Sequence, residues 1–436
     1  MPDSTPIYNL KAVMKEVGLS AATLRAWEFR YGLPKPQRTA GGQRLYSRQD
    51  IEMLKWLVAR QNEGLSISHA VELWKSQSAT EQAAPVVGDG QVLLPGPGQD
   101  VFDELWQKWL AACLAFDDLA ANRILDQAFA LAAPETICVE VLQKGLAKLG
   151  QLWYNGSLSV QQEHFASAIA LRRLNSLLAG VVPPSRPGRI IAACPPAEAH
   201  DFSLLLVTYL LRRSGWDVVF LGSNVPLQDL DITMQVVSPA LVVSAAQTLN
   251  AAASLQIIAE SLAQQGVPLA YGGGIFVTTP EITHSISGYY LGSEILQVPQ
   301  QVDRLLKVST QILSAQPIST EYSRVVQLYK EKKAQIVSIV NTDLRIRQLD
   351  PFLQEAAVED LSKAIESALT LGDINLLDKT SDWLNGLLIN HGFPLTLLQQ
   401  LYTAYQQSLQ RALPGEATLI LAWLERQLRH DDLASR

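Results

Sequence analysis

The sequence has few cysteines, no long apolar run and no secretion signal. Only three cysteines occur in 436 residues, and the wide spacing of Cys113, Cys138 and Cys194 excludes a disulfide framework and a tight zinc knuckle. The longest apolar runs, such as residues 204–207, are far shorter than the roughly 18 apolar residues that a membrane helix needs. The N-terminus lacks the basic start and apolar core of a secretion signal. We therefore expect no membrane partner and a cytoplasmic location.

Charge is also scarce, and it is distributed unevenly. Charged residues make up 18% of the chain and hydrophobic residues 48%, which excludes extended disorder. The net charge of −7 argues against nucleic acid as a partner, but residues 1–76 carry 11 Lys and Arg against 7 Asp and Glu. This local balance of +4 leaves −11 for the remainder of the chain. A basic module is thus attached to an acidic body.

Composition shifts divide the chain into a multidomain α and α/β protein. Residues 77–99, rich in Ala, Gln, Pro and Gly, are expected to be a linker after a first domain over 1–76. Residues 100–182 have apolar residues at 3- and 4-residue steps, which predicts a four-helix bundle. Residues 189–312 alternate apolar strands with helices, which predicts a doubly wound parallel sheet of the flavodoxin-like (Rossmann-like) type. Residues 320–436 return to helical spacing and predict a second, four-helix-like bundle.

The first segment has the pattern of a winged helix-turn-helix. Residues 10–17 and 21–31 predict two short helices, separated by a turn that contains Gly18. Residues 32–46 are rich in Gly and Pro, which disfavours a helix and suits a β-hairpin wing. Residues 47–50 fit a capping box that starts a third helix.

Fixed offsets within this segment carry a family resemblance. They include Leu24-Arg25-Ala26-Trp27-Glu28, Arg30-Tyr31-Gly32-Leu33-Pro34, Gly42-x-Arg44-x-Tyr46 and Asp50-Ile51. The pattern resembles the winged helix-turn-helix of the MerR family, which implies a second helix in the major groove, a wing on the phosphates and a dimer on two half-sites. Guanidinium groups on such a helix and wing can pair with phosphate. The candidate DNA-binding residues are Thr23, Arg25, Arg30, Arg38, Arg44 and Tyr46.

The loop after the first expected strand of the third segment carries Glu198-x-His200, and Ser244 and Gly272-Gly273-Gly274 follow at later strands. This order resembles the cobalamin-binding signature of flavodoxin-like corrinoid domains, which implies that His200 is the lower axial ligand of cobalt. An imidazole is a suitable nitrogen ligand, and Glu198 can fix its tautomer. Gly272 and Gly273 permit close backbone approach, and the small Ser244 leaves room for the buried part of the cofactor.

The helical segment upstream contains Trp153, Val160, Glu163 and His164, with nine residues between the Trp and the Glu-His pair. This spacing resembles that of the light-responsive, cobalamin-dependent MerR-type repressors, the CarH and LitR group. The resemblance implies that the segment is a cap over the upper face of adenosylcobalamin and that these four residues surround the adenosyl group. An indole over an apolar ligand and polar groups near a ribose make physical sense.

Three positions depart from the family patterns. Ser203 stands where the corrinoid signature has Gly, and Glu198 stands where Asp is commoner. Tyr154 follows Trp153, where some members have a His that can bind cobalt once the alkyl group is lost. Tyr154 supplies no such imidazole, so a phenolate or water could take the vacant site.

Three functions fit these patterns. The leading one is a transcription regulator, a repressor and not an enzyme, that binds double-stranded operator DNA as a homo-oligomer (dimer or tetramer) and uses adenosylcobalamin as a light-sensing chromophore. By resemblance, light cleaves the cobalt–carbon bond, the oligomer dissociates and DNA is released. A second is a cobalamin sensor that is blind to light or that carries a bilin beside the corrin. A third, from another class, is a corrinoid methyl-carrier protein.

The resemblance does not reach residues 320–436. Within this tail, His391 is expected to be a turn residue and His430 a solvated terminal residue. The tail could dimerise, gate the DNA-binding segment or receive another signal, and its sequence does not choose between these roles.

Overall fold

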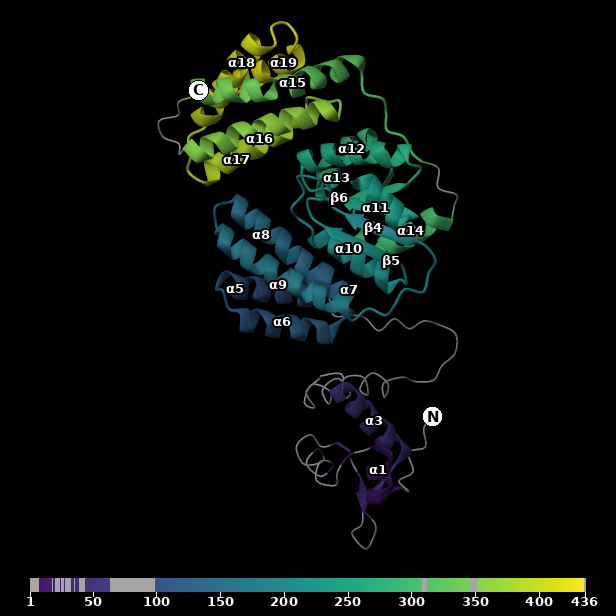
Figure 1. Cartoon of the computed structure of the whole chain (residues 1–436). Helices are drawn as coiled ribbons and strands as arrows, with labels where there is room; N and C mark the ends of the chain where they lie inside the picture. Colours follow the sequence, from purple (N-terminus) through teal and green to yellow (C-terminus); the bar gives the residue numbers. More distant parts are fainter. Residues whose placement is uncertain are drawn as a thin grey trace. The chain divides into compact units, whose positions relative to one another are not determined.

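The computed structural model describes residues 8–17, 19, 24, 27, 33–34, 36–38, 44–62, 99–307, 312–344 and 351–434. The chain divides into two compact units, Met1–Gly96 and Pro97–Arg436 (Figure 1). None of the helices in the described ranges is both long enough and apolar enough to cross a membrane.

A small antiparallel sheet organises the first unit. Its strands are β1 (Tyr8–Asn9), β2 (Gln37–Arg38) and β3 (Arg44–Tyr46), and β3 lies between the other two. β2 and β3 pair with Arg38 opposite Arg44. This pairing confirms the β-hairpin that the Gly- and Pro-rich composition of residues 32–46 predicts.

Two helices of the first unit agree with the sequence. α1 (Leu10–Val17) has the expected bounds, and α3 (Arg48–Asn62) starts at the expected capping box. The Ser47 N–H donates to Asp50 Oδ2 at 2.8 Å, and the Asp50 N–H donates to Ser47 Oγ at 3.1 Å. Each residue therefore satisfies a backbone donor that the helix start would leave unpaired. Most of the helix expected over residues 21–31 lies outside the described residues.

The second unit begins with a helical cap, the helices of residues 99–179. They are α5 (Gln99–Leu114), α6 (Asp118–Leu131), α7 (Pro134–Ile137), the π-helical η1 (Cys138–Gln143), α8 (Lys144–Tyr154) and α9 (Val160–Ala179). α7, η1 and α8 follow one another without a break, so the cap has the four helical rods of the predicted bundle. Trp109 is fully buried at its centre, and a Cβ at Gly145 would lie 2.6 Å from the indole. The glycine thus lets α8 approach the largest core side chain.

A five-stranded parallel sheet follows and confirms the doubly wound fold. Its strands are β4 (Arg189–Ala193), β5 (Asp217–Gly222), β6 (Leu241–Ala245), β7 (Leu269–Gly272) and β8 (Tyr289–Tyr290), in the order β5-β4-β6-β7-β8. This is the flavodoxin-like order, in which the chain reverses its direction of winding between the first and third strands. Loops at the carboxyl ends of β4 and β6 therefore open apart and leave a crevice for a ligand.

Helices cover both faces of this sheet domain, which spans residues 189–307. They are α10 (Phe202–Arg213), α11 (Leu230–Val237), α12 (Leu249–Gln264), α13 (Gly274–Thr278) and α14 (Val298–Lys307), with 3-10 turns η2 (Pro280–Ser285) and η3 (Ile295–Gln297). Apolar residues of α10 and α14 pack with Ile190 and Val243 on one face. Residues of α11 and α12 pack with Ile191 and Val242 on the other. Successive residues of each strand thus point to opposite faces, and both faces are buried.

The tail bundle, residues 320–434, differs from expectation in its number of helices. The described part contains five: α15 (Thr320–Asp343), α16 (Pro351–Thr370), α17 (Leu376–Asn390), α18 (Thr396–Ala412) and α19 (Thr418–Ala434). The expected four-helix-like bundle over residues 320–436 is therefore one helix short. Val325, Tyr329, Ile336 and Val340 give α15 a buried stripe at helical spacing. The bundle packs on α12, and the two share one apolar core (Figure 1).

Candidate functional site

A buried carboxylate orients a histidine in the loop after β4. Glu198 is 0% exposed, and its Oε1 accepts from the His200 N–H at 2.9 Å and from His200 Nδ1 at 2.8 Å. Its Oε2 accepts from the Gln247 N–H at 2.5 Å. Since a carboxylate only accepts, Nδ1 must carry the proton, which leaves the Nε2 lone pair for a ligand. The His200 side chain is 70% exposed, so Nε2 is accessible.

The same contact controls the basicity of the imidazole. The hydrogen bond with Glu198 raises the pKa of His200 above its ordinary value, against a lowering by burial. The negative charges of Glu198, Glu163 and Asp201 raise the pKa of His200 further. A more basic imidazole is a stronger nitrogen donor to a metal, although protons compete for it to a higher pH.

A cavity of about 190 Å³ lies at the carboxyl edge of the sheet. Five positions named from the sequence meet in its lining: Ser203, Ser244, Gly272, Gly273 and Gly274. Ser244 is held by a hydrogen bond from its Oγ to the Ala193 carbonyl at 2.7 Å. The cavity is therefore adjacent to the end of β4, from which the Glu198 and His200 loop departs.

Glycine is required at position 273. Its φ is +120°, and a Cβ there would lie 2.0 Å from the carbonyl oxygen of Ala246. Only glycine adopts this backbone conformation readily, and only glycine fits against that carbonyl.

Gln247 joins the cavity to the histidine loop, and the sequence reasoning missed it. Its backbone N–H donates to Glu198, and its side-chain Oε1 accepts from the Gly274 N–H at 2.7 Å. The available signal was its place just after β6, at the carboxyl edge where ligands bind.

The cap residues lie at the start of α9 and the end of α8. Val160 is the first residue of α9 and is exposed. Glu163 accepts from Ser167 Oγ at 2.6 Å and contacts His164 Nδ1 at 2.5 Å, and the His164 side chain is 75% exposed. The negative charge of Glu163 contributes to the raised pKa of His200.

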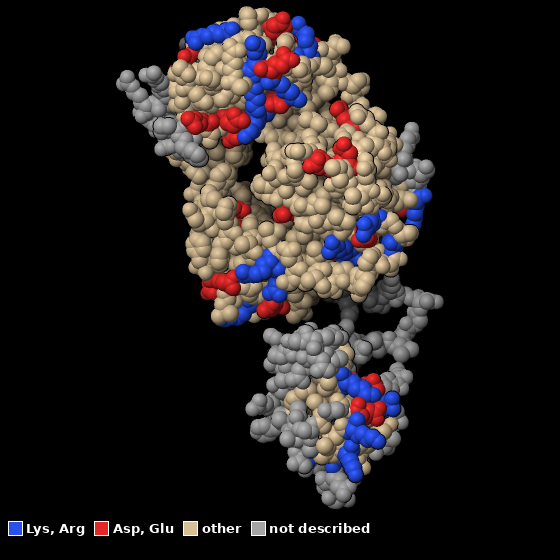
Figure 2. Space-filling model, in the orientation of Figure 1, with Lys and Arg blue, Asp and Glu red and all other residues tan. Residues whose placement is uncertain are grey.

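Trp153 contacts the tail bundle, which the sequence did not anticipate. Its ring stacks on Trp383 at a centroid distance of 6.3 Å and lies 6.0 Å from the ring of His391. Tyr154 stacks on the same Trp383 at 5.7 Å. His391, expected as a turn residue, lies in the turn directly after α17, and its Nε2 also donates to the Trp153 carbonyl at 3.1 Å. In the space-filling view a hollow opens between the cap, the sheet domain and the tail bundle (Figure 2).

The candidate DNA-binding residues are only partly described. Thr23, Arg25 and Arg30 lie outside the described residues, whereas the backbones of Arg38 and Arg44 are paired in the wing hairpin. Tyr46 is 1% exposed and packs in the core of the first unit. The Tyr46 ring therefore supports the wing from inside, and its contact with DNA stays a prediction.

The metal-ligating side chains suit a metal ion that a chelating cofactor already holds. Among the described ranges, no group of three or more His, Cys, Asp or Glu side chains could hold a free ion. Burial raises the pKa of the thiols of Cys113, Cys138 and Cys194 to about 12, so none is a ready thiolate ligand. His200 does not line the cavity itself, but it offers a single nitrogen three residues before Ser203, which does line it. This arrangement suits a macrocyclic metal complex with an extended substituent, such as a corrinoid.

Comparison with known protein families gives two matches. Residues 8–77 match the MerR HTH family regulatory protein description, and residues 105–178 match the B12 binding domain description. The second match covers most of the helical cap and the first covers the winged unit.

Curated proteins that are similar to this chain include two repressors and a corrinoid protein. The HTH-type transcriptional repressor CarH of Myxococcus xanthus is 32% identical over 269 residues, which is 61% of this chain and 88% of CarH. The repressor CarA of the same organism is 31% identical over 221 residues, 50% of this chain and 69% of CarA. The methanol–corrinoid protein of Methanosarcina barkeri is 26% identical over 131 residues, 30% of this chain and 50% of that protein.

Proposed function

Since the chain belongs to the family of HTH-type transcriptional repressors that includes CarH and CarA, we propose that adenosylcobalamin and light control its binding to operator DNA. It is a transcriptional regulator with a MerR-type helix-turn-helix and a B12-binding domain. In this proposal it acts as a repressor, and its active form is a dimer or tetramer on two or more half-sites.

The buried Glu198–His200 pair is the observation that carries the proposal. A carboxylate without solvent contact is costly unless its partners satisfy it, and Glu198 satisfies itself with two backbone N–H groups and the imidazole. Its main effect is to point His200 Nε2 away from the loop as a basic nitrogen. The cavity lined by Ser244, Gly272 and Gly273 gives the cofactor's extended substituent a place beside this ligand.

Each candidate residue then has a role. His200 would hold the cobalt through its Nε2 nitrogen, and Glu198 and Gln247 would hold the loop that carries His200. Trp153, Val160, Glu163 and His164 contact the upper ligand from the cap. Adenosylcobalamin, when bound, supplies a cobalt–carbon bond that green or blue light cleaves. The positions of the cap residues depend on whether the upper ligand is present. These positions in turn determine whether the protein forms the oligomer that binds DNA.

The test compares DNA binding in darkness and after illumination. The full chain is loaded with adenosylcobalamin, its target is selected from a randomised DNA pool in the dark, and affinity is measured at one fixed salt concentration. We expect illumination to weaken DNA binding at least tenfold and to lower the mass of the protein measured by light scattering. Hydroxocobalamin, which lacks the adenosyl group, is the matched control and should give no light response. Equal affinity and equal mass before and after illumination of the adenosyl form would refute the light switch.

The alternatives give different signals in the same preparation. A bilin beside the corrin adds a far-red absorption band that no corrinoid has. The similarity to a methanol–corrinoid protein motivates the methyl-carrier alternative. That alternative requires transfer of a methyl group from the bound corrinoid to a thiol or tetrahydrofolate acceptor, and DNA binding independent of the corrinoid.

A further inference from the structure

Helix α17 of the tail bundle contacts both the sheet domain and the helical cap. In its first half, Lys379 Nζ donates to the Thr278 carbonyl at 2.7 Å and lies 3.1 Å from Glu281 Oε1, both in the sheet domain. At its end, Asn390 Nδ2 donates to the Tyr154 carbonyl at 3.1 Å in the cap. A helix of 15 residues is about 22 Å long at 1.5 Å per residue. The helix therefore spans from the segment after Gly273 to the end of α8.

The contacts come from one face of the helix. Lys379, Trp383, Gly386 and Asn390 are separated by four, three and four residues, the spacing of a single helical stripe. Trp383 is 45% exposed even though it stacks on both Trp153 and Tyr154. A large apolar ring is thus partly exposed at its contact with the cap.

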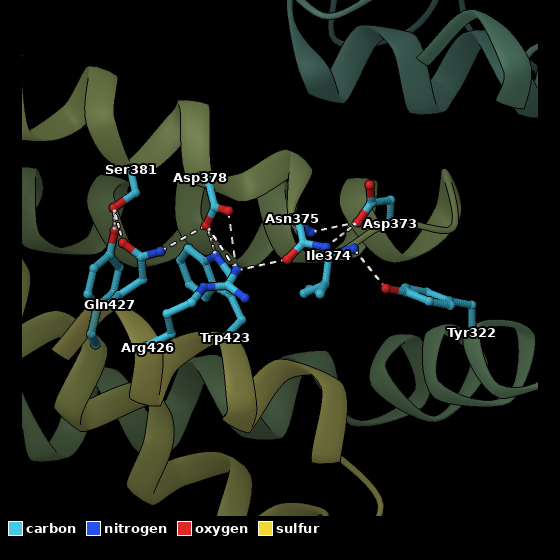
Figure 3. A network of polar contacts seen from close by, with 10 residues as sticks. Tyr322, Asp373, Ile374, Asn375, Asp378, Ser381, Trp423, Arg426 and Gln427 are labelled. Atoms are coloured by element: carbon cyan, nitrogen blue, oxygen red, sulfur yellow. Dashed lines mark hydrogen bonds and ion pairs between the residues drawn. The ribbon is translucent and has the colours of Figure 1, made fainter. Parts of the chain in front are cut away.

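A different face of α17 holds it in the tail bundle. Asp378 accepts from Trp423 Nε1 at 2.8 Å, from Arg426 at 3.1 Å and from Gln427 Nε2 at 2.9 Å. Ser381 donates to Gln427 Oε1 at 3.0 Å, so two successive turns of α17 are tied to α19 (Figure 3). These bonds to α19 fix the orientation of α17. They thereby hold Lys379, Trp383, Gly386 and Asn390 on the face toward the sheet domain and the cap.

Two glycines permit close approach at the cap contact. A Cβ at Gly386 of α17 would lie 1.8 Å from Tyr154 Oη and 2.9 Å from Cζ of the same ring. A Cβ at Gly156, in the turn after α8, would lie 2.9 Å from the Asn390 carbonyl. Gly386 thus leaves room for the Tyr154 ring, and Gly156 leaves room for the Asn390 carbonyl.

We propose that α17 is a positioning element of the cobalamin site, which holds the Trp153 indole through Trp383 and His391 so that upper-ligand binding and tail docking are coupled. The inference rests on the proposed function, in which Trp153 contacts the upper ligand. Trp383 and His391 pack on Trp153 from the tail, and they limit the positions that its indole can adopt when it meets a ligand. The coupling is reciprocal: docking strengthens binding of the adenosyl group, and the adenosyl group strengthens docking. Docking of the tail bundle thereby depends on whether the adenosyl group is present on the corrinoid.

The test uses the full chain and two glycine-to-alanine variants. Gly386→Ala forces the Tyr154 ring to move, whereas Gly150→Ala, in α8, adds a methyl group that meets no atom within 4 Å. Alanine favours a helix over glycine at both positions, so both variants should fold. We expect Gly386→Ala to weaken adenosylcobalamin binding in the dark about tenfold and to leave hydroxocobalamin binding within twofold. Gly150→Ala should change neither.

Hydrogen exchange of residues 376–390 in the wild-type chain is the second measurement, and it requires no variant. Exchange should be slower with adenosylcobalamin than with hydroxocobalamin. Unchanged adenosylcobalamin affinity in Gly386→Ala, or equal exchange with the two corrinoids, would overturn the coupling while leaving the cobalamin-dependent regulator intact. A wild-type chain that binds neither corrinoid would instead overturn the proposed function together with the coupling. In that event, faster exchange of α17 in corrinoid-free Gly386→Ala would still show the docking itself.

Discussion

Replacement of Gly273 by Ala tests how strictly the backbone of the cavity is defined. The residue has φ +120° and ψ 165°, a region that only glycine occupies readily, and the strain for alanine is about 1–3 kcal/mol. The new Cβ would also lie 2.0 Å from the Ala246 carbonyl oxygen, so the loop must shift. That shift would break the 3.0 Å bond from the Ala246 N–H to the Gly272 carbonyl. Losing such a bond costs about 1 kcal/mol, so the total expected destabilisation is about 2–4 kcal/mol.

The matched control is Gly266→Ala, which separates backbone strain from the steric clash. Gly266 has φ +73°, but a Cβ there meets no atom within 4 Å, so we expect a loss of about 1 kcal/mol and no effect on the cavity. Urea unfolding followed by circular dichroism gives the two midpoints, and titration with hydroxocobalamin gives the two affinities. Gly273→Ala should have the lower midpoint and bind the corrinoid at least tenfold more weakly. If the two variants were equal in midpoint and affinity, the reasoning about this loop would be refuted.

Three further predictions concern the ligand, the cavity and the DNA-binding unit. Because the hydrogen bond with Glu198 raises the pKa of His200, corrinoid affinity should fall as the pH drops through that raised pKa. Glu198→Gln should move this fall to lower pH in a titration at constant ionic strength, and an unchanged profile would contradict the assigned cause. Ser244→Leu should abolish corrinoid uptake by filling the cavity, while Ser244→Ala should retain most of it; equal uptake would place the cofactor elsewhere. Arg25→Ala should weaken DNA binding and change its salt dependence without altering the corrinoid spectrum, and undiminished binding would remove Arg25 from the interface.

Much of the fold follows from local patterns in the sequence. The strands near residues 190, 218, 241 and 269 are short apolar runs between helices, and burial on both faces leaves them few alternatives. The capping box at Ser47 marks the start of α3 because two backbone donors need partners there. Strand β8 was missed because two residues, Tyr289 and Tyr290, are too short to show a period.

The sequence also predicts one part of the candidate site and leaves another part unpredicted. The sequence places Glu198, His200 and Ser244 at the carboxyl edge because the strand order of an α/β sheet brings those loops together. It does not reveal that Trp153 meets Trp383, since 230 residues separate them and each lies in a helix with its own amphipathic pattern. Contacts between such distant helices depend on how whole domains pack, and helical periodicity does not specify that packing.

The net charge of the whole chain is a poor guide to DNA binding. The overall value of −7 would exclude a DNA-binding protein only if charge were uniform along the chain. The first unit carries the basic excess, and the match to MerR regulators covers residues 8–77 of it. Charge balance is therefore informative for each domain separately.

The absorption spectrum of the purified full chain with adenosylcobalamin is the most direct test that His200 holds this cofactor and that the cofactor responds to light. It should be recorded before and after illumination for the wild-type chain and for His200→Ala. We expect the wild-type chain to retain adenosylcobalamin in the dark and to change its spectrum in light, and we expect His200→Ala to lose the cofactor or to alter the dark spectrum. Retention of the cofactor by His200→Ala with the wild-type spectrum, or a wild-type spectrum unchanged by light, would contradict these expectations.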